Sequence, residues 1–510
     1  MAQDMLDAIS SQIRRTPEAA ALQTGGRIYS FGALGRRVQG IYDALAETAG
    51  RGLVLIAGHK EADAVAAMLA CMFLGRAFAF IDRSNPPGRA ADILRLSKAD
   101  LVLTAGSGTA IPGARSLALS QIADRPFDLR PAAVPDSDLL YVVFTSGSTG
   151  TPKGVPCGRG NFAAFDAWYR QMLADLPGQD LAPAQSAHVN HASLAFDMGM
   201  LDLWPVLALG RPVILLDHGD NVIPRNNIKA LTKSDLVQAR SWFSTPSLLQ
   251  IMAMDPKFNG DTLPAMRCFF VGGEIVPREL LQTLAARFPQ AEIRHAYGPT
   301  ETTCLSHVHS LTAADLAGSG LLPLGPALGA FAMRILDEED RDVAPGEVGE
   351  VVLSGPQVVR GYLPADHPAN RAFATLDGVA IYRTGDFGKR DADGSLTLLG
   401  RIDRQVKWNG NRIELDEIER AAYRTKGVQK AACIPIKEDN RVVDILLLVQ
   451  PETGATLTTQ AVAEVLLAAL PATMVPRDIR VVASLPVTVN GKLDSKALLK
   501  THLAPVAETV

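Results

Sequence analysis

Short apolar runs alternate with helical stretches over most of this 510-residue chain, and this alternation restricts its fold more than any other feature. Runs 53–57, 77–81, 101–103 and 213–216 have the composition of buried strands, and 62–74 has the length of a helix. Strands that alternate with helices predict βαβ units, because a crossover helix is the usual link between two parallel strands. We therefore predict the α/β class, with a large N-terminal body of βαβ units.

The residue pattern of the sequence changes near residue 333. Between 333 and 400, Gly-Glu turns and short alternating runs predict a small β subdomain. The polar segment 401–404 separates two strand-like runs, and we expect it to be a hinge. The predicted domains are an N-terminal core at 1–400, which includes the β subdomain, and a mobile α+β C-terminal domain at 405–510, in which the βαβ pattern resumes.

The charge balance argues against a nucleic-acid partner. Fifty Lys and Arg residues against 54 Asp and Glu leave a formal net charge of -4. No block of the sequence holds the surplus of cations that displaces counterions from a polyanion. With 47% hydrophobic and 20% charged residues, the composition is that of a globular protein.

Five scattered cysteines, an odd number, show neither C-x-x-C spacing nor histidines at metal-ligand distances, so we expect neither a disulfide framework nor a structural zinc site. The acidic N-terminus lacks the basic start and apolar run of a secretory signal. The longest apolar stretch, 64–81, is interrupted by Gly75 and Arg76, which predicts a buried helix leading into a strand rather than a bilayer span. We therefore expect a cytoplasmic protein without a membrane partner.

The segment 141–154 carries the strongest chemical signal, because a hydrophobic strand leads directly into residues rich in glycine and hydroxyl groups. Glycines let backbone N–H groups approach an anion, hydroxyls donate further hydrogen bonds, and a lysine adds positive charge. The segment predicts a phosphate-binding loop, although it lacks the Gly-Lys-Ser/Thr ending of a Walker A motif. A flexible Ser/Gly linker is the alternative. The candidate phosphate-binding residues are Thr145, Ser146, Gly147, Ser148, Thr149, Gly150 and Lys153.

Residues 145–154 resemble the phosphate loop of the adenylate-forming enzymes, the superfamily of acyl-CoA synthetases and peptide-synthetase adenylation domains. The resemblance covers nearly the whole chain and implies that family's fold, with ATP and magnesium as cofactors. Four further motifs follow in the order that the family requires: Ala296-Tyr297-Gly298-Pro299-Thr300-Glu301, Tyr382-Arg383-Thr384-Gly385-Asp386, Gly400-Arg401-Ile402-Asp403 and Asn490-Gly491-Lys492-Leu493-Asp494.

The resemblance implies a nucleotide site built from these motifs. Tyr297 would lie against the purine, which the backbone at 272–274 would bracket from the other side. Asp386 would accept hydrogen bonds from the ribose hydroxyls, and Arg401 would reach the ribose or a phosphate. Without the resemblance, each is more simply interpreted as a turn or surface residue. The implied ATP-binding residues beyond the phosphate loop are Gly273, Glu274, Ala296, Tyr297, Gly298, Thr300, Asp386, Arg401 and Lys492.

The candidate catalytic residues are Lys492 and Thr300. Attack of a carboxylate on the α-phosphorus of ATP builds negative charge on the phosphate oxygens, and a positioned ammonium lowers this barrier. A lysine after Asn-Gly is typically a solvated residue at a turn tip, but the resemblance implies that Lys492 takes part in adenylation. It also implies that Glu301 holds magnesium and that rotation at Asp403 withdraws Lys492 after the first step.

Asp197, which follows the strand-like run 194–196, is the candidate that selects an amino acid substrate. A carboxylate between apolar neighbours needs a cation or shifts its pKa, and in amino-acid-activating members of the family an aspartate here pairs with the α-ammonium. A helix N-cap aspartate is the alternative. The resemblance places eight uncharged residues around the substrate side chain: Met198, Leu201, Phe243, Phe270, Gly272, Ala296, Cys304 and Leu305.

A charged substrate side chain would lack a partner in such a pocket, so we expect a small neutral, mostly apolar amino acid, alanine-like or proline-like. Residues 196–205 and 244–247 resemble the stand-alone D-alanine:carrier-protein ligases. The sequence departs from them at Gly272, where they usually place a cysteine, so the identity and chirality of the amino acid stay open. Because the chain ends at Val510, soon after the lysine motif, we expect the thiol acceptor to be a phosphopantetheinylated carrier protein in trans.

The predicted function is therefore that of an AMP-forming amino acid:carrier-protein ligase. An acyl-CoA synthetase for a small or aryl carboxylic acid is the first alternative, and an inactive nucleotide-binding paralogue is the second. Retention of Glu301, Asp386 and Lys492 together argues against the second alternative.

Overall fold

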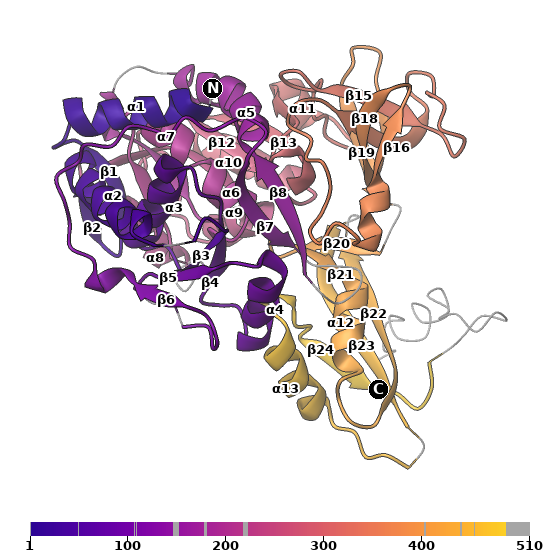
Figure 1. Ribbon diagram of the computed structural model, residues 1–510. Coiled ribbons are helices and arrows are strands. Elements are labelled where there is room, and N and C mark those ends of the chain that lie inside the picture. The colour runs from indigo at the N-terminus through magenta and orange to yellow at the C-terminus, as the bar shows by residue number, and fades with distance from the viewer. Residues whose placement is uncertain are drawn as a thin grey trace. The chain divides into compact units, whose positions relative to one another are not determined.

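The computed structural model describes residues 2–48, 50–106, 108, 110–145, 152–177, 181–217, 223–401, 404–438, 441–452 and 454–485. The chain divides into two compact units. The first comprises Met1–Arg83, Ile93–Phe144 and Lys153–Asp403, and the second comprises Ser84–Asp92, Thr145–Pro152 and Arg404–Val510. The α/β class is confirmed, with a large body of parallel sheets and a smaller C-terminal part (Figure 1). The predicted domain boundaries stay a prediction, and Asp403 lies outside the described residues.

A six-stranded sheet is formed, in this order, by β6 (Ser116–Ala118), β5 (Leu101–Thr104), β3 (Val54–Gly58), β4 (Phe78–Asp82), β7 (Leu139–Thr145) and β8 (Lys153–Gly158). The pairs β3–β4, β3–β5, β4–β7 and β5–β6 are parallel. Between β3 and β4, helix α3 (Ala62–Leu74) is apolar all round and buried from Ala64 to Phe73, as a helix inside a core must be. Other helices among these strands are α2 (Phe31–Ala46), α4 (Pro87–Ser97) and the 3-10 turn η1 (Leu119–Gln121).

An eight-stranded sheet is formed, in this order, by β14 (His307–Ser310), β13 (Glu292–Tyr297), β12 (Cys268–Gly272), β11 (Gln238–Ser244), β9 (Ser186–Asn190), β10 (Val213–Leu215), β1 (Ala20–Thr24) and β2 (Arg27–Ser30). Its inner pairs are parallel and its two edge pairs, β13–β14 and β1–β2, are antiparallel. Its helices are α1 (Ala2–Arg15), α5 (Arg159–Ala174), α6 (Asp197–Leu201), α7 (Trp204–Ala208), α8 (Pro224–Leu231), α9 (Pro246–Ala253), α10 (Arg278–Arg287), α11 (Ala313–Ala317) and the 3-10 turns η2 (Pro183–Gln185) and η3 (Thr300–Thr302).

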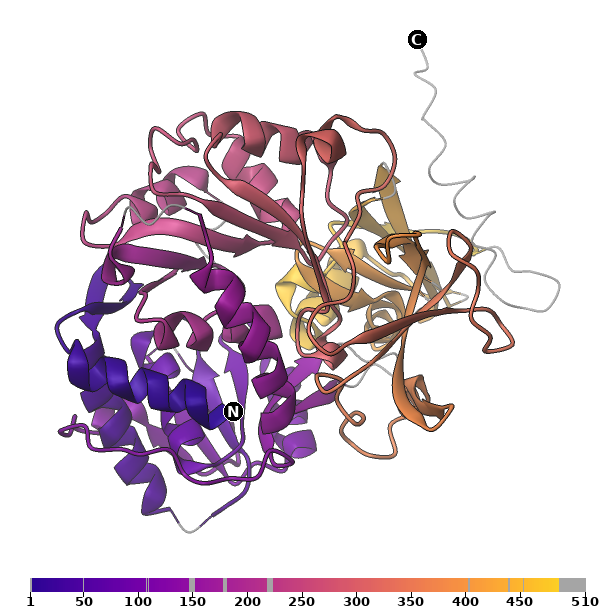
Figure 2. The same cartoon turned by 90° about the horizontal axis from the view of Figure 1, so that it is seen from above.

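The main hydrophobic core of the first unit draws on both sheets. Trp204 of α7 is fully buried, and its ring lies 6.0 Å from Phe78 of β4, 6.0 Å from Tyr141 of β7 and 5.4 Å from Phe162 of α5. Helix α1 packs beside α5 and α7 (Figures 1 and 2). None of the described helices is long and apolar enough to cross a bilayer.

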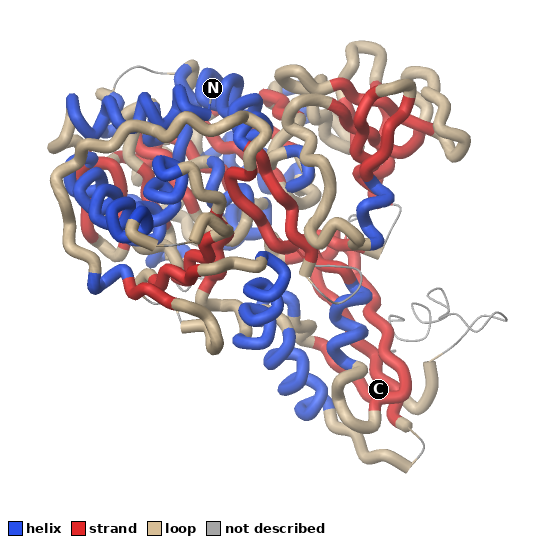
Figure 3. Tube along the Cα trace, viewed as in Figure 1, coloured by secondary structure: helices blue, strands red, loops and turns tan. Residues whose placement is uncertain are grey.

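An antiparallel sheet occupies the last part of the first unit, where strands and loops predominate (Figure 3). Tyr297 of the larger body packs in the same hydrophobic cluster as residues of this sheet, so the sheet adjoins the end of β13. Its strands are β15 (Ala332–Leu336), β16 (Val348–Ser354), β17 (Phe373–Leu376), β18 (Val379–Arg390) and β19 (Leu396–Arg401), and η4 (Pro368–Ala372) precedes β17.

The second unit contains the hairpin β20 (Gln405–Trp408) and β21 (Asn411–Glu414), whose turn residues Asn409 and Gly410 both have positive φ. A three-stranded sheet of β22 (Val428–Glu438), β23 (Arg441–Pro451) and β24 (Asp478–Val481) follows. The β22–β23 pair is antiparallel, so among the described residues of this unit only β23, α13 (Thr459–Ala469) and β24 form the expected βαβ unit. The remaining elements are α12 (Leu415–Ala422) and η5 (Ala472–Met474).

Candidate active site

The predicted phosphate loop begins where β7 ends. Thr145 is the last residue of β7, and its side chain is buried. Within the described residues, Thr145 Oγ1 has no hydrogen-bond partner. A buried hydroxyl needs a partner to offset its lost hydration, and a phosphate oxygen fits such a donor. Outside the described residues lie Ser146, Gly147, Ser148, Thr149 and Gly150.

Tyr362 connects the loop lysine to the predicted metal ligand. Lys153 begins β8 and is buried, and its Nζ lies 4.3 Å from the centre of the Tyr362 ring. The Tyr362 hydroxyl donates to Glu301 Oε1 at 2.6 Å. Gly154 N–H donates to Leu363 O at 3.0 Å, and this bridge holds Tyr362 beside β8. One ring thus receives a cation on its face and contacts a carboxylate through its hydroxyl.

The chemistry of Glu301 fits magnesium. Glu301 lies in η3, which Thr300 opens, and its side chain is fully buried. Magnesium prefers carboxylate oxygens and usually combines one or two of them with water and substrate phosphates. Among the described residues, no group of three or more His, Cys, Asp or Glu side chains is arranged to hold a metal ion. A metal that shares its coordination with the phosphates of ATP needs only one such carboxylate.

Three predicted nucleotide-binding residues meet in one hydrogen-bonded group. The Tyr297 hydroxyl, at the end of β13, donates to Asp386 Oδ2 at 2.5 Å. Arg401 Nη1 lies 2.5 Å from Asp386 Oδ1, because the two residues are register partners in the β18–β19 pair. The Asp386 N–H donates to the Thr384 hydroxyl at 3.0 Å, and that hydroxyl donates to Val351 O at 2.7 Å. The buried carboxylate of Asp386 therefore has one cationic and one neutral partner.

The phenol of Tyr297 is held in its donor form. Burial, followed by the charge of Asp386, raises the pKa of Tyr297 well above its usual value. The His307 ring lies 5.8 Å from the Tyr297 ring, and burial lowers the pKa of His307 to about 3, so this imidazole is neutral. The stacking of a purine on Tyr297 stays a prediction.

The glycines at the other predicted nucleotide-binding positions are required by the local backbone. A Cβ at Gly298 would lie 2.2 Å from Cys304 O, so only glycine fits there. Gly273 has a φ of +89°, a left-handed conformation that glycine adopts without strain. Glu274 Oε2 accepts hydrogen bonds from Ser247 N–H at 3.1 Å and Ser247 Oγ at 2.6 Å, so this side chain holds the first turn of α9.

The predicted strand at 194–196 is wrong, because this run forms a turn. The Phe196 N–H donates to Ser193 O at 3.0 Å, a local bond that replaces a sheet ladder. The turn leads into α6, whose N-cap is Phe196 and whose first residue is Asp197. The alternative in which Asp197 is the N-cap is therefore wrong. Asp197 Oδ1 accepts a hydrogen bond from Met198 N–H at 2.8 Å.

The predicted pocket residues gather on one face of the eight-stranded sheet. Phe243 of β11 pairs with Phe270 of β12, and their rings are 6.2 Å apart. Gly272, two residues further along the same face, pairs with Ala296 of β13. A Cβ at Gly272 would lie 2.3 Å from Ala296 O, so backbone forms this part of the surface. The hydrophobic cluster that contains Phe243, Phe270 and Ala296 also contains Leu201, Cys304 and Leu305, and Met198 packs against it.

Asp197 acts electrostatically on this apolar cluster. Burial, followed by the charge of Asp197, raises the pKa of Cys304 well above its usual value. Burial raises the pKa of Cys157 to about 12, and the charge of Asp197 adds to this rise. Both thiols stay neutral at physiological pH. An ammonium ion beside Asp197 would be stabilised by an anion among neutral, apolar neighbours, where Coulomb attraction is weakly screened.

Sequence reasoning missed Tyr362 and Thr384. Tyr362 lies 61 residues from Glu301 in the sequence, and no local pattern links the two. Thr384 lies inside a motif that the sequence displayed, and its pattern gave no reason to assign it a role. Like the loop residues 146–150, the predicted residues Lys492 and Asp403 lie outside the described residues.

Two family models match the sequence, the AMP-binding enzyme model over residues 9–363 and the AMP-binding enzyme C-terminal domain model over residues 417–492. A D-alanine--D-alanyl carrier protein ligase of Bacillus velezensis is 32% identical over 508 residues, which cover 97% of this chain and 98% of the relative. A protein of the same name from Lactiplantibacillus plantarum is 31% identical over 518 residues, which cover 98% and 99%.

Solved structures share the fold. The Vibrio cholerae adenylation domain AlmE, in complex with glycyl-adenosine-5'-phosphate, has a TM-score of 0.83 at 21% identity, with 97% of each chain covered. The structure of holo-PA1221, an NRPS protein containing adenylation and PCP domains, has a TM-score of 0.80 at 25% identity and covers 97% of this chain and 84% of that chain.

Proposed function

The chain belongs to the AMP-binding enzyme family, and we propose that it is an AMP-forming amino acid:carrier-protein ligase. In the first step, the carboxylate of the amino acid attacks the α-phosphorus of ATP, which yields aminoacyl-AMP and pyrophosphate. In the second step, the phosphopantetheine thiol of a separate carrier protein loses its proton, attacks the acyl carbon and releases AMP. The names of the near-full-length relatives support this reaction.

The position of Asp197 is the observation that carries the choice of an amino acid. Its carboxylate begins α6, and its charge acts on Cys304 of the apolar cluster. A substrate with an ammonium next to its carboxylate meets an anion there, and an apolar side chain meets Phe243 and Phe270. The proposed substrate is therefore a small neutral amino acid, alanine-like or proline-like.

The nucleotide would be held through Asp386. Its oxygens already accept hydrogen bonds from Tyr297 and Arg401, so the carboxylate is fixed in place before a ribose arrives. A carboxylate held in this way is a strong acceptor for ribose hydroxyls. In this proposal the purine lies against Tyr297 and the backbone at 272–274.

The triphosphate end would be held by hydroxyl and cationic groups. Thr145 and Thr300 would donate to phosphate oxygens, and Lys153 would add positive charge. Magnesium bound at Glu301 would neutralise phosphate charge. Lys492 is the proposed catalytic cation, and we place the hinge that withdraws it at Asp403. The buried free thiols suit the reducing cytoplasm that we propose as its compartment.

ATP–pyrophosphate exchange with all D- and L-amino acids, and with small and aryl carboxylic acids, tests this function. We expect exchange with one or a few small neutral amino acids and loss of most exchange in Asp197→Ala, because the substrate ammonium loses its counterion. Asp235→Ala, which removes an exposed acid, is the matched control.

Exchange driven by carboxylic acids without an amine, and unaffected by Asp197→Ala, would instead identify an acyl-CoA synthetase. ATP binding without exchange for any acid would identify an inactive paralogue. Transfer of the radiolabelled amino acid to a phosphopantetheinylated carrier protein then tests the second step.

A further inference from the structure

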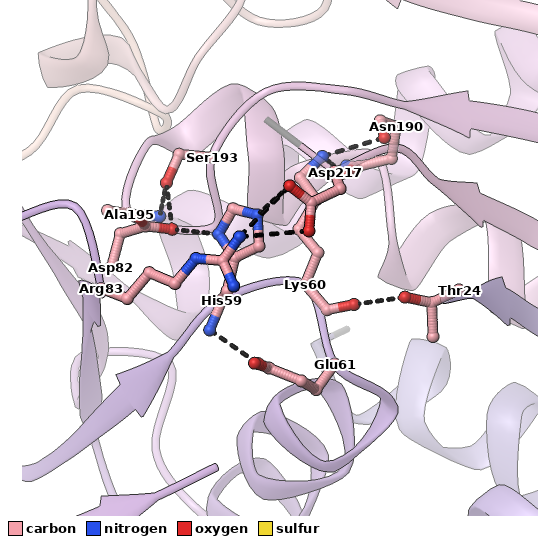
Figure 4. Close-up of polar contacts among 10 residues, drawn as sticks. All are labelled: Thr24, His59, Lys60, Glu61, Asp82, Arg83, Asn190, Ser193, Ala195 and Asp217. Atoms are coloured by element: carbon pink, nitrogen blue, oxygen red, sulfur yellow. Dashed lines mark hydrogen bonds and ion pairs between the residues drawn. The ribbon is translucent and has the colours of Figure 1, made fainter. Parts of the chain in front are cut away.

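A group of polar side chains lies where parallel strands of both sheets of the first unit end (Figure 4). His59 and Lys60 follow β3, Asp82 ends β4, Asn190 ends β9, and Asp217 follows β10. His59 Nδ1 is hydrogen-bonded to Asp82 Oδ2 at 2.8 Å. The carboxyl ends of parallel strands are where α/β folds bind ligands, so this group borders the substrate side of both sheets.

Lys60 is the buried amine of this group. Its Nζ donates to the main-chain O of Asn190 at 2.9 Å and to Asn190 Oδ1 at 2.6 Å. Lys60 is only 3% exposed, and Asn190 is fully buried. Burial lowers the pKa of Lys60 to about 7, and the charges of Asp202, Asp82 and Asp217 oppose this shift. A lysine at this depth is unfavourable without specific partners, and Asn190 supplies two acceptors.

Asn190 in turn holds helix α6. Its Nδ2 donates to Gly199 O at 2.8 Å and to Asp202 Oδ1. Gly199 lies within α6, and Asp202 is the C-cap of that helix. Because Lys60 Nζ donates to the side-chain oxygen of Asn190, the side-chain nitrogen of Asn190 points to α6. The flipped amide would place its oxygen against Gly199 O and its nitrogen against the Lys60 ammonium.

Helix α6 is also held tightly on its other side. A Cβ at Gly199 would lie 1.9 Å from Ser193 O, so the helix rests directly on the preceding turn. The Ser193 hydroxyl donates to Asp82 Oδ2 at 3.2 Å, which ties this turn to β4. Asp202 Oδ2 is hydrogen-bonded to His188 Nε2 at 3.1 Å. A helix of five residues has little stability of its own, so these contacts set its position.

We propose that Lys60 is a positioning residue for substrate binding: through Asn190 it fixes α6 and, with it, the carboxylate of Asp197. This inference rests on the proposed function, in which Asp197 binds the substrate ammonium. The path of hydrogen bonds from Lys60 leads to α6, so loss of the lysine acts on the amino acid and leaves ATP binding unchanged.

Lys60→Met tests this role, because methionine keeps an unbranched side chain and removes the donor. We expect the KM for the amino acid in pyrophosphate exchange to rise about tenfold, because both hydrogen bonds from Lys60 to Asn190 are lost and α6 is held less firmly. The KM for ATP should stay within about twofold, because the Asp386 group is untouched. Lys257→Met, which removes an exposed lysine, is the matched control.

Amide hydrogen exchange gives a readout that does not depend on activity. We expect the amides of 197–203 to exchange faster in Lys60→Met than in the wild type, and those of 238–244 in β11 to be unchanged. If the wild type shows no exchange with any amino acid, the proposed function fails while this measurement still tests Lys60.

The proposed role of Lys60 would be overturned by an unchanged KM for the amino acid, by equal rises in both KM values, or by unchanged amide exchange at 197–203. Should Lys60→Met not fold, Lys60→Leu, which also lacks a donor, takes its place, and the same split between the two KM values is expected.

Discussion

Replacing Asp166 by asparagine should stabilise the protein near neutral pH and have little effect in acid. Asp166 lies on α5 with only 2% of its surface exposed. Its Oδ2 lies 3.0 Å from Arg170 Nη2, whereas Oδ1 has no hydrogen-bond partner within the described residues. Burial raises the pKa of Asp166 to about 6, although the charge of Arg170 acts in the opposite direction.

The sign and size of the effect follow from proton linkage. Because the pKa of Asp166 rises from 3.8 in the unfolded chain to about 6 in the folded protein, the folded protein binds this proton more tightly. The free energy of unfolding therefore falls as the pH rises through this window, by about 3 kcal/mol in total. Asparagine does not ionise, so Asp166→Asn avoids this loss above about pH 7.

Urea unfolding of the wild type and Asp166→Asn, followed by circular dichroism near pH 4 and near pH 8, measures the difference. We expect similar midpoints in acid and a higher midpoint for the variant at the alkaline value. Asp235→Asn, at an exposed acid, should show no such change. An equal gain at both pH values, or a less stable variant near pH 8, would refute the burial argument.

Two substitutions test the nucleotide end of the site. Tyr297→Phe removes a donor from the buried Asp386 carboxylate, so the KM for ATP should rise about tenfold while the KM for the amino acid is unchanged; equal effects on both substrates would contradict this. Lys492→Ala should lower pyrophosphate exchange by about 10²–10³-fold and spare thiol transfer from chemically prepared aminoacyl-AMP. Loss of both half-reactions would contradict the proposed role of Lys492.

The predictions from sequence succeeded where a signal is local. The helix predicted at 62–74 matches α3, and the strand predicted at 53–57 differs from β3 by one residue at each end. In both places a run of apolar residues ends at a clear break. The strand predicted at 194–196 failed because the Ser193 hydroxyl accepts a hydrogen bond from the Ala195 N–H at 3.2 Å, a local bond that competes with a sheet partner.

Contacts between distant parts of the chain were beyond sequence reasoning. Motifs pointed to Tyr297 and Asp386, which the structure brings into one hydrogen-bonded group. Lys60 and Asn190 lie 130 residues apart, and their contact exists only because strands of two sheets end at the same place. No periodicity within either segment carries that information.

The close approach of β12 and β13 at Gly272 leaves space for glycine alone at this position of the proposed substrate pocket in this protein. Main-chain atoms form the surface at this position, and a larger residue in place of Gly272 would require the two strands to separate. Under the proposed function, we expect a change of acyl substrate to be accommodated first at Met198 and Cys304, which lie outside the paired strands β12 and β13.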